Sequence, residues 1–136
     1  MHPQLLEGAK IALAGFLGGI VGFERERKSK PAGLRTHILT SMAAALLTIL
    51  SKKGFPGADP ARLIAGMVAG MGFIGAGTII KTESKVVGVT TAASILVATG
   101  IGIAVGSDFY ILAIVSALLA YLVLELKSFE RRICGK

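Results

Sequence analysis

Five long apolar stretches, separated by short polar loops, make up most of this 136-residue chain. They cover residues 5–23, 36–50, 63–80, 86–106 and 109–126. A helix needs roughly 20 apolar residues to cross the hydrocarbon core of a bilayer. Only 17% of the residues are charged, whereas soluble domains contain about 25%. The sequence therefore predicts an all-α integral membrane bundle of about five transmembrane helices, formed by residues 1–136 as one domain.

The polar breaks between the segments carry turn and helix-capping residues. Pro31 and Gly33 indicate a turn after the first segment. Asp59 is expected to cap the third helix, because Asp accepts hydrogen bonds from the first helical amides, and the Pro that follows suits the first helical position. Ser107 and Asp108 are expected to cap the fifth helix in the same way. The first four residues lack the positive charge of a signal peptide, so we expect the first segment to be retained.

Basic residues are concentrated in segments that would share one side of the membrane if five helices alternate in direction. Eleven of the fifteen belong to this group: Arg25, Arg27, Lys28, Lys30, Arg35, Lys81, Lys85, Lys127, Arg131, Arg132 and Lys136. Because basic residues collect on the cytoplasmic side, the N-terminus is expected outside and the C-terminus in the cytoplasm. Orientation accounts for the net charge of +7. No basic face with interleaved aromatics indicates binding to nucleic acid.

A shift of the chain by 55 residues gives a weak internal repeat. It aligns Gly22 with Gly77 and Thr36 with Thr91. The matching residues fall late in the first helix of each pair and early in the second. We therefore expect two helical hairpins of the same orientation, with the fifth helix added to them.

A glycine-rich run, GMGFIGAG at residues 70–77, contains the pattern G-x-G-x-x-G. A dinucleotide fingerprint would need a preceding strand, whereas this run lies within an apolar segment. Small residues let membrane helices approach closely, so we expect the run to mediate helix packing. The alternative is that it bends or unwinds the third helix. The glycines expected to serve packing are Gly18, Gly22, Gly66, Gly70, Gly72, Gly75 and Gly77.

Charged and polar residues gather where the first segment ends and the second begins. Glu24 and Arg35 lie at matching boundaries, and an ion pair between them would join the two helices where unpaired charge is costly. The alternative is that residues 24–28 form a solvated helix end. His37 is more typical of a packing or capping residue than of a metal ligand, because a lone histidine does not make a metal site.

Hydroxyl side chains cluster at the start of the fourth segment. Thr91 and Ser94 share one helix face, and they are expected to bond across helices or back to the backbone. The alternative is that these two hydroxyls and that of Thr90 line a polar pocket with Thr36, Thr40 and Glu24. The complete predicted polar layer comprises Glu24, Arg25, Arg35, Thr36, His37, Thr90, Thr91 and Ser94.

Sequence features typical of enzymes and of ion-coupled transporters are absent from this chain. No carboxylate falls near the middle of a segment, whereas proton- and cation-coupled transporters usually carry such groups. The sequence has no Ser-His-Asp set, no cluster of metal-ligating residues and no phosphate-binding loop. We therefore expect no enzymatic activity, no cofactor and no metal site.

Four blocks of the sequence together resemble the MgtC/SapB family of membrane proteins. In the family's order they are GFERERKSKPAGLRTH (residues 22–37), DPAR (59–62), GMGFIGAG (70–77) and GVTTAAS (88–94). The chain departs from the family pattern at Gly66, where Gln is common, and at Ile95–Leu96, where Leu-Trp is common. Longer members continue into a soluble ACT-like domain, which lies outside this resemblance.

The resemblance implies a bacterial inner-membrane protein linked to adaptation to low magnesium and, in pathogens, to virulence. It also implies action on other membrane proteins, including the proton-translocating ATP synthase, rather than catalysis. Our first hypothesis is a regulatory membrane protein, a homodimer, whose glycine-rich faces bind partner helices. The alternative is a small transporter or channel for Mg²⁺ or another cation, with the polar layer at its cytoplasmic gate.

Overall fold

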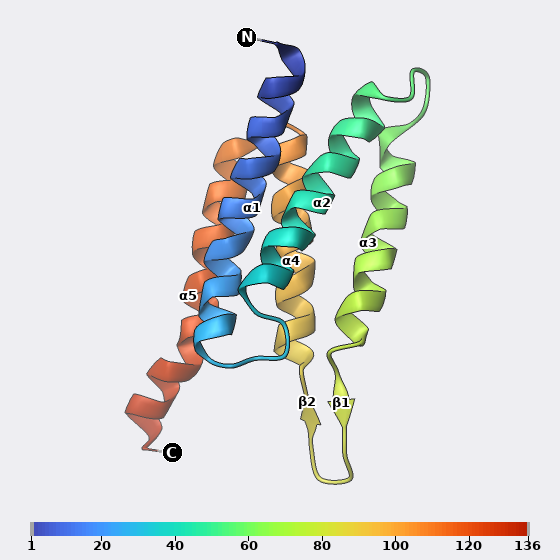
Figure 1. Cartoon of the computed structure of the whole chain (residues 1–136). Coiled ribbons are helices and arrows are strands. Elements are labelled where there is room, and N and C mark those ends of the chain that lie inside the picture. Colours follow the sequence, from blue (N-terminus) through green and yellow to red (C-terminus); the bar gives the residue numbers. More distant parts are fainter. Residues whose placement is uncertain (1, 136) are drawn as a thin grey trace.

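The computed structural model describes residues 2–135 and contains five helices that run antiparallel to one another in chain order (Figure 1). The helices are α1 (Pro3–Arg27), α2 (Leu34–Lys53), α3 (Pro60–Ala76), α4 (Val89–Gly106) and α5 (Tyr110–Cys134). Two short antiparallel strands, β1 (Ile80–Lys81) and β2 (Val86–Val87), form a hairpin between α3 and α4. The predicted all-α helical membrane bundle is confirmed. Four helices are long and apolar enough to cross a membrane, while α3, with 17 residues, is shorter.

The α3–α4 connection differs from its prediction, because Ile80 and Val86 belong to the hairpin and not to helices. Asp59 caps α3 as expected, accepting a 3.0 Å hydrogen bond from the amide of Ala61. The helix is continuous over Pro60–Ala76, so the glycine run does not break it. Gly88 has a φ of +95°, a conformation that Gly adopts without steric cost, and it separates β2 from the start of α4.

Helix α4 lies at the centre of the bundle, where it contacts each of the other four helices. Its approach to α2 depends on glycine, because a Cβ on Gly102 would lie 2.7 Å from the Cβ of Ala44 and one on Gly106 would lie 2.8 Å from that of Thr48. Helix α1 reaches α2 in the same manner at Gly18, where a Cβ would lie 2.7 Å from the carbonyl oxygen of His37. The expected packing role of small residues is confirmed at these crossings.

Helix α3 lies at the edge of the bundle, against α2 and α4 (Figure 1). Of its predicted packing glycines, Gly75 does contact α4, since a Cβ there would lie 3.3 Å from the carbonyl oxygen of Ala92. The prediction is wrong within this chain for Gly66, Gly70 and Gly72, which are exposed and have nothing within 4 Å of a Cβ position. They lie on the side of α3 that no other described helix covers. Gly77 ends α3 and approaches its own last turn rather than another helix.

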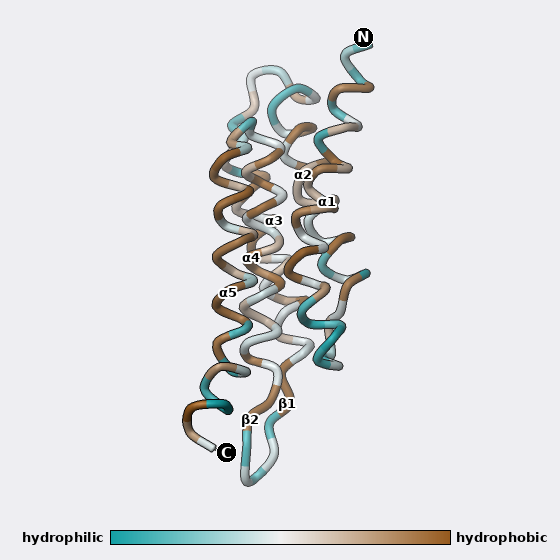
Figure 2. The backbone as a smooth tube through the Cα atoms, turned by 90° about the vertical axis from the view of Figure 1, so that its left-hand side faces the viewer, coloured by the Kyte–Doolittle hydropathy of each residue, from teal (hydrophilic) through white to brown (hydrophobic). Residues whose placement is uncertain are grey.

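Hydrophobic residues cover the middle of the bundle, most clearly along α5, and hydrophilic residues gather toward its two ends (Figure 2). The α1–α2 loop, the β-hairpin and the C-terminal part of α5 all lie at the same end (Figure 1). These are the segments that carry most of the basic residues, and we call this the basic end. By the positive-inside rule, a cytoplasmic location of the basic end stays a prediction.

The two proposed hairpins of the internal repeat have different connections. The segment between α1 and α2 contains no strand, whereas α3 and α4 are joined through β1 and β2. Superposition of the two pairs stays a prediction.

The opposite end of the bundle is held by a cluster of ion pairs. Lys10 contacts Asp108 at 2.7 Å and Glu7 at 3.2 Å, and Lys52 contacts Asp108 at 3.3 Å. The cluster joins α1 and α2 to the α4–α5 turn. The expectation that Ser107 and Asp108 cap α5 is wrong, because the residue before α5 is Phe109 and it has no side-chain capping bond. Asp108 has φ +70° and accepts bonds from Lys10, Lys52 and the hydroxyl of Tyr110 instead.

Replacing Asp108 is expected to lower stability in a pH-dependent manner. The hydrogen bond from Lys10, followed by the bond from Tyr110, holds the pKa of Asp108 below its ordinary value. A carboxyl group with a lowered folded-state pKa stabilises the protein above its unfolded pKa, about 3.9 for Asp, and loses this effect as the pH falls through the folded-state pKa. The thermal midpoint of Asp108→Asn should therefore lie below that of the wild type at pH 6, and the difference should shrink as the pH is lowered below about 4.

The control for this experiment is Glu83→Gln in the hairpin, since Glu83 is exposed and forms no ion pair within residues 2–135. A gap between wild type and Asp108→Asn that stays constant from pH 6 to pH 3, or no gap at all, would contradict the prediction.

Candidate functional site

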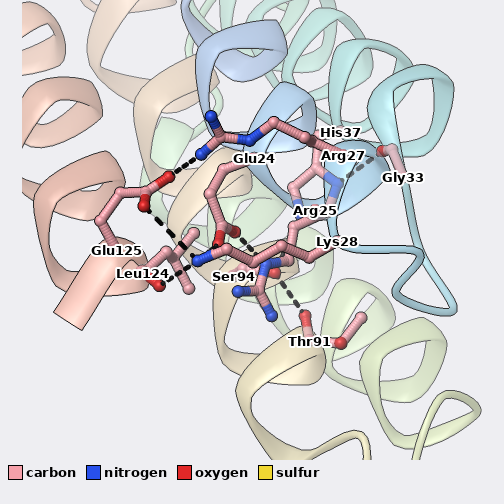
Figure 3. Close-up of polar contacts among 10 residues, drawn as sticks. All are labelled: Glu24, Arg25, Arg27, Lys28, Gly33, His37, Thr91, Ser94, Leu124 and Glu125. Atoms are coloured by element: carbon pink, nitrogen blue, oxygen red, sulfur yellow. Dashed lines mark hydrogen bonds and ion pairs between the residues drawn. The ribbon is translucent and has the colours of Figure 1, made fainter. Parts of the chain in front are cut away.

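The predicted polar layer forms at the basic end, where the last turns of α1 meet the first turns of α2 and α4 (Figure 3). Glu24 is completely buried there, and its carboxylate contacts two cations of its own helix. The Nε of Arg25 lies 2.6 Å from one oxygen, and the Nζ of Lys28 lies 2.7 Å from the other. Because Arg25 is itself 96% buried (4% exposed), this is a desolvated ion pair rather than the solvated helix end considered as the alternative.

The expected pair between Glu24 and Arg35 is wrong. Arg35 is exposed on the first turn of α2 and makes no ion pair with any described residue. The two carboxylate oxygens of Glu24 already have partners on α1, one residue and one helical turn further along the chain. Intrahelical pairing at the i, i+4 spacing costs less chain ordering than a contact across the loop.

His37 joins three parts of the bundle. It is completely buried, with Nδ1 2.8 Å from the carbonyl oxygen of Gly33 and Nε2 2.9 Å from the hydroxyl of Ser94 on α4. Which atom donates in each of these bonds depends on the tautomer of the ring, and the Ser94 hydroxyl has a single proton to share between Nε2 and the backbone. The Ser94 hydroxyl also lies 2.7 Å from the carbonyl oxygen of Thr91. The histidine therefore acts as a structural link between α2 and α4, in agreement with the expected packing role.

Two threonines of the predicted layer, and Thr40 of the alternative polar pocket, lie apart from this network. Thr90 is exposed, Thr36 is half-buried, and Thr40 is buried. The hydroxyls of these three threonines make no recorded hydrogen bond with the described chain. The structure thus brings together Glu24, Arg25, His37, Thr91 and Ser94, and leaves out Arg35, Thr36 and Thr90.

Sequence reasoning missed the contribution of α5. Glu125 lies at its basic end, pairs with Arg27, and contacts the Nζ of Lys28 at 3.6 Å. Lys28 also donates to the carbonyl oxygen of Leu124 at 3.3 Å. The sequence did contain a signal, because Glu125 is the only carboxylate in the last apolar segment, residues 109–126. A lone acid at a membrane boundary needs a cation from another helix.

The charged network ties helices together at the basic end. Each oxygen of the buried Glu24 carboxylate already contacts a cation. No three His, Cys, Asp or Glu side chains come together as a metal site among the described residues. The arrangement fixes the relative positions of α1, α2, α4 and α5 at the basic end.

Removing the His37–Ser94 bond is expected to destabilise the fold. Ser94→Ala leaves Nε2 of the buried His37 without its partner, and an unsatisfied buried polar group costs about 1–3 kcal/mol. The unfolding free energy in mixed micelles should fall by that amount. Thr90→Val is the matched control, because Thr90 lies on the same helical turn but is exposed. Equal stability of Ser94→Ala and Thr90→Val would show that the bond contributes nothing.

The apolar helices, the basic end and its buried ion pairs define a multi-pass helical membrane protein. Comparison with known proteins gives the family: residues 11–132 match the MgtC family. The chain belongs to this family, as its sequence blocks indicated.

Three relatives illustrate the family. The chain is 44% identical over 124 residues to the "Putative magnesium transporter YhiD" of Escherichia coli (strain K12), covering 85% of this chain and 58% of that protein. It is 40% identical to Protein SapB of Bacillus subtilis (strain 168), covering 92% of this chain and 57% of SapB. It is 37% identical to Protein MgtC of Brucella abortus (strain 2308), covering 77% and 44%. The chain thus spans about half the length of these curated relatives. No solved structure matches it.

Proposed function

We propose that this protein is a regulatory membrane protein that binds the transmembrane helices of other membrane proteins through α3. The observation that carries this proposal is the uncovered small-residue face of that helix. Gly66, Gly70 and Gly72 are exposed, with open space around each Cβ position, and Ala65 and Ala69 are exposed beside them. Small residues in membrane helices let a second backbone approach closely, and within this chain none does so at these positions.

The physiological setting is proposed from the family. The name of the relative YhiD mentions magnesium. We propose that this protein acts in adaptation to low magnesium in the bacterial inner membrane, and in virulence where the bacterium is a pathogen. The proton-translocating ATP synthase is one target that the family resemblance implies. A homodimer is a second possible use of the α3 face, and enzymatic activity is not part of this proposal.

Transport of Mg²⁺ or another cation is the second candidate function, and the name of the relative YhiD favours it. The charges of the polar layer disfavour cation transport. The one buried carboxylate of that layer, Glu24, is neutralised by Arg25 and Lys28, and Arg35 adds an exposed positive charge to the layer. A divalent cation needs oxygen ligands of its own, and like charges along its path would repel it.

Site-directed crosslinking in native membranes tests the proposal. Ala69→Cys places a reactive group on the α3 face in a chain whose natural Cys134 has been changed to serine. A photoactivatable maleimide on this cysteine should crosslink to a separate membrane protein. Leu119→Cys on α5, whose original side chain is exposed, is the matched control and should give no such product.

The competing outcomes are separated by adding Gly66→Leu. This change has open space in the folded chain, so it should leave stability unaltered while blocking a helix that approaches α3. Loss of the Ala69 product in this variant supports the proposal. A product that contains only two copies of this chain would assign the face to a homodimer, and equal crosslinking from Ala69→Cys and Leu119→Cys would contradict a specific surface.

A further inference from the structure

A polar pocket of about 240 Å³ lies at the basic end, beside the buried ion pairs but separate from the α3 face. Three elements each contribute one cation to its lining: Arg25 comes from α1, Lys30 from the α1–α2 loop, and Lys127 from α5, which is distant in sequence. The rest of the lining comes from Pro31, β2 and the beginning of α4, and no acidic side chain belongs to it. The pocket is therefore positively charged on several sides.

Arg25 is the buried component of this pocket. Its side chain is only 4% exposed, and its Nε bonds to Glu24 at 2.6 Å. The described chain supplies no hydrogen-bond acceptor for its two terminal amino groups, and Figure 3 draws no contact to them. A guanidinium carries five donors, and the terminal amino groups of Arg25 are not among the fully buried side-chain atoms that lack a partner, so they stay accessible from the pocket that Arg25 lines. The positive-inside rule accounts for basic residues on the surface, but it does not account for a buried arginine with free donors facing a pocket.

The first turn of α4 is the second source of donors. The first amides of a helix have no partner within the helix, and the residue before α4, Gly88, has no side chain to cap them. Val89, Thr90 and Thr91 all line the pocket. A helix N-terminus also carries a partial positive charge, and together these features favour an anion.

The two lysines add further positive charge to the same pocket. Lys30 lies in the loop, and the positive charge of Lys127, together with burial and the charge of Arg25, lowers the pKa of Lys30. Arg131 repels the same group. An anion between these cations would remove the repulsion, and the nearest buried carboxylate, Glu24, is already bound by Arg25 and Lys28.

We propose that this pocket binds a phosphate group, held by Arg25, Lys30, Lys127 and the first-turn amides of α4. The volume agrees with this ligand, because pockets for whole small molecules usually measure about 300–1,000 Å³, whereas a phosphate group with a few waters of about 30 Å³ each needs less. Two sources can present the group. One is the head group of an anionic phospholipid, since basic pockets between helices on the cytoplasmic side suit such lipids. The other is a free phosphate compound in the cytoplasm.

The inference is independent of the α3 contact proposed above, and lipid and phosphate binding by the purified protein tests it. The double variant Lys30→Gln/Lys127→Gln removes two cations from the pocket while keeping Arg25 in its ion pair. The matched control is Lys81→Gln/Lys85→Gln, which removes the same charge from the same end of the bundle but from the hairpin, where neither residue lines the pocket.

Two probes separate the sources of the phosphate group. Native mass spectrometry after extraction from nanodiscs that contain phosphatidylglycerol and phosphatidylcholine reports retained lipid. Calorimetric titration with inorganic phosphate in neutral detergent reports the free anion. We expect the wild type to bind one of these probes, and the pocket variant to bind it at least about tenfold more weakly, because each lysine lost removes a charge-assisted bond. The control variant should bind as the wild type does.

The loss of binding in the two double variants separates the possible outcomes. Preferential retention of phosphatidylglycerol, weakened only by the pocket variant, supports the lipid head group. Binding of inorganic phosphate with the same pattern supports a free phosphate compound. Equal weakening by the two double variants would show that general positive charge attracts the anion, and failure of the folded wild type to bind either probe would overturn the proposal.

Discussion

Glu24→Gln is expected to lower the unfolding free energy by about 3–5 kcal/mol, because it removes one partner of a buried ion pair. The change leaves the shape of the side chain intact but takes away the negative charge that faces Arg25 and Lys28. Arg25, 96% buried, would then hold its charge in a site that water hardly reaches. The measurement is a denaturant titration of the purified protein in mixed micelles, followed by circular dichroism.

Two further variants make this result specific to the pair. Glu130→Gln removes an acid from the exposed surface of α5, where no ion pair with the described residues involves it, and should change stability by less than about 0.5 kcal/mol. Glu24→Gln combined with Arg25→Gln should recover part of the loss, since the uncompensated buried charge is then absent. A Glu24→Gln protein as stable as Glu130→Gln would show that the buried pair contributes nothing.

Gly102→Ala is expected to destabilise the bundle strongly, while Gly100→Ala on the same helix is expected to be harmless. A Cβ on Gly102 would lie 2.7 Å from the Cβ of Ala44 and 3.0 Å from the backbone nitrogen of Ala45. Backbone atoms of α2 cannot move aside as a flexible side chain can, so α2 and α4 must separate. Overpacking of this kind costs about 1–3 kcal/mol.

The control has the opposite expected sign. Gly100 is exposed, with nothing within 4 Å of its Cβ position, and Ala exceeds Gly in helix propensity by up to about 1 kcal/mol. Gly100→Ala should therefore match or exceed the wild type in thermal midpoint, and Gly102→Ala should fall below it. Two variants that respond alike would contradict the close α2–α4 contact.

The sequence predicted the helical elements well, because each apolar segment had to satisfy its backbone inside a bilayer. Asp59 and Pro60 correctly indicated the start of α3. The ends of elements were less predictable. Ile80 and Val86 continue the apolar pattern of the helices, yet Ile80 pairs with Val87 and Val86 pairs with Lys81 in a hairpin closed by Thr82 and Lys85. Apolar residues at a membrane boundary suit a strand as well as a helix, and periodicity does not separate the two.

The site was predictable in position but not in pairing. The run of charges that starts at Glu24 indicated a polar layer at the end of the first helix. In the structure Glu24, His37 and Ser94 of this layer are buried. The partner of Glu24 depends on side-chain directions that spacing alone leaves open, since Arg25, Lys28 and Arg35 all lie within reach in the sequence.

The packing of individual glycines could not be predicted from spacing either. Gly18 and Gly66 have equivalent patterns, and only the arrangement of helices shows that Gly18 is packed and Gly66 is exposed.

We propose that the protein acts through contacts with other membrane proteins and does not itself carry ions. The most direct test is ion flux into liposomes that contain the purified protein, with an Mg²⁺-sensitive dye and a pH-sensitive dye trapped inside in separate preparations. Circular dichroism would confirm that the reconstituted chain is helical, and an ionophore would confirm that the vesicles hold a gradient. We predict Mg²⁺ and H⁺ entry at the rate of protein-free vesicles. Entry of either ion that exceeds this rate and rises with the amount of protein would contradict the regulatory account and favour the transporter.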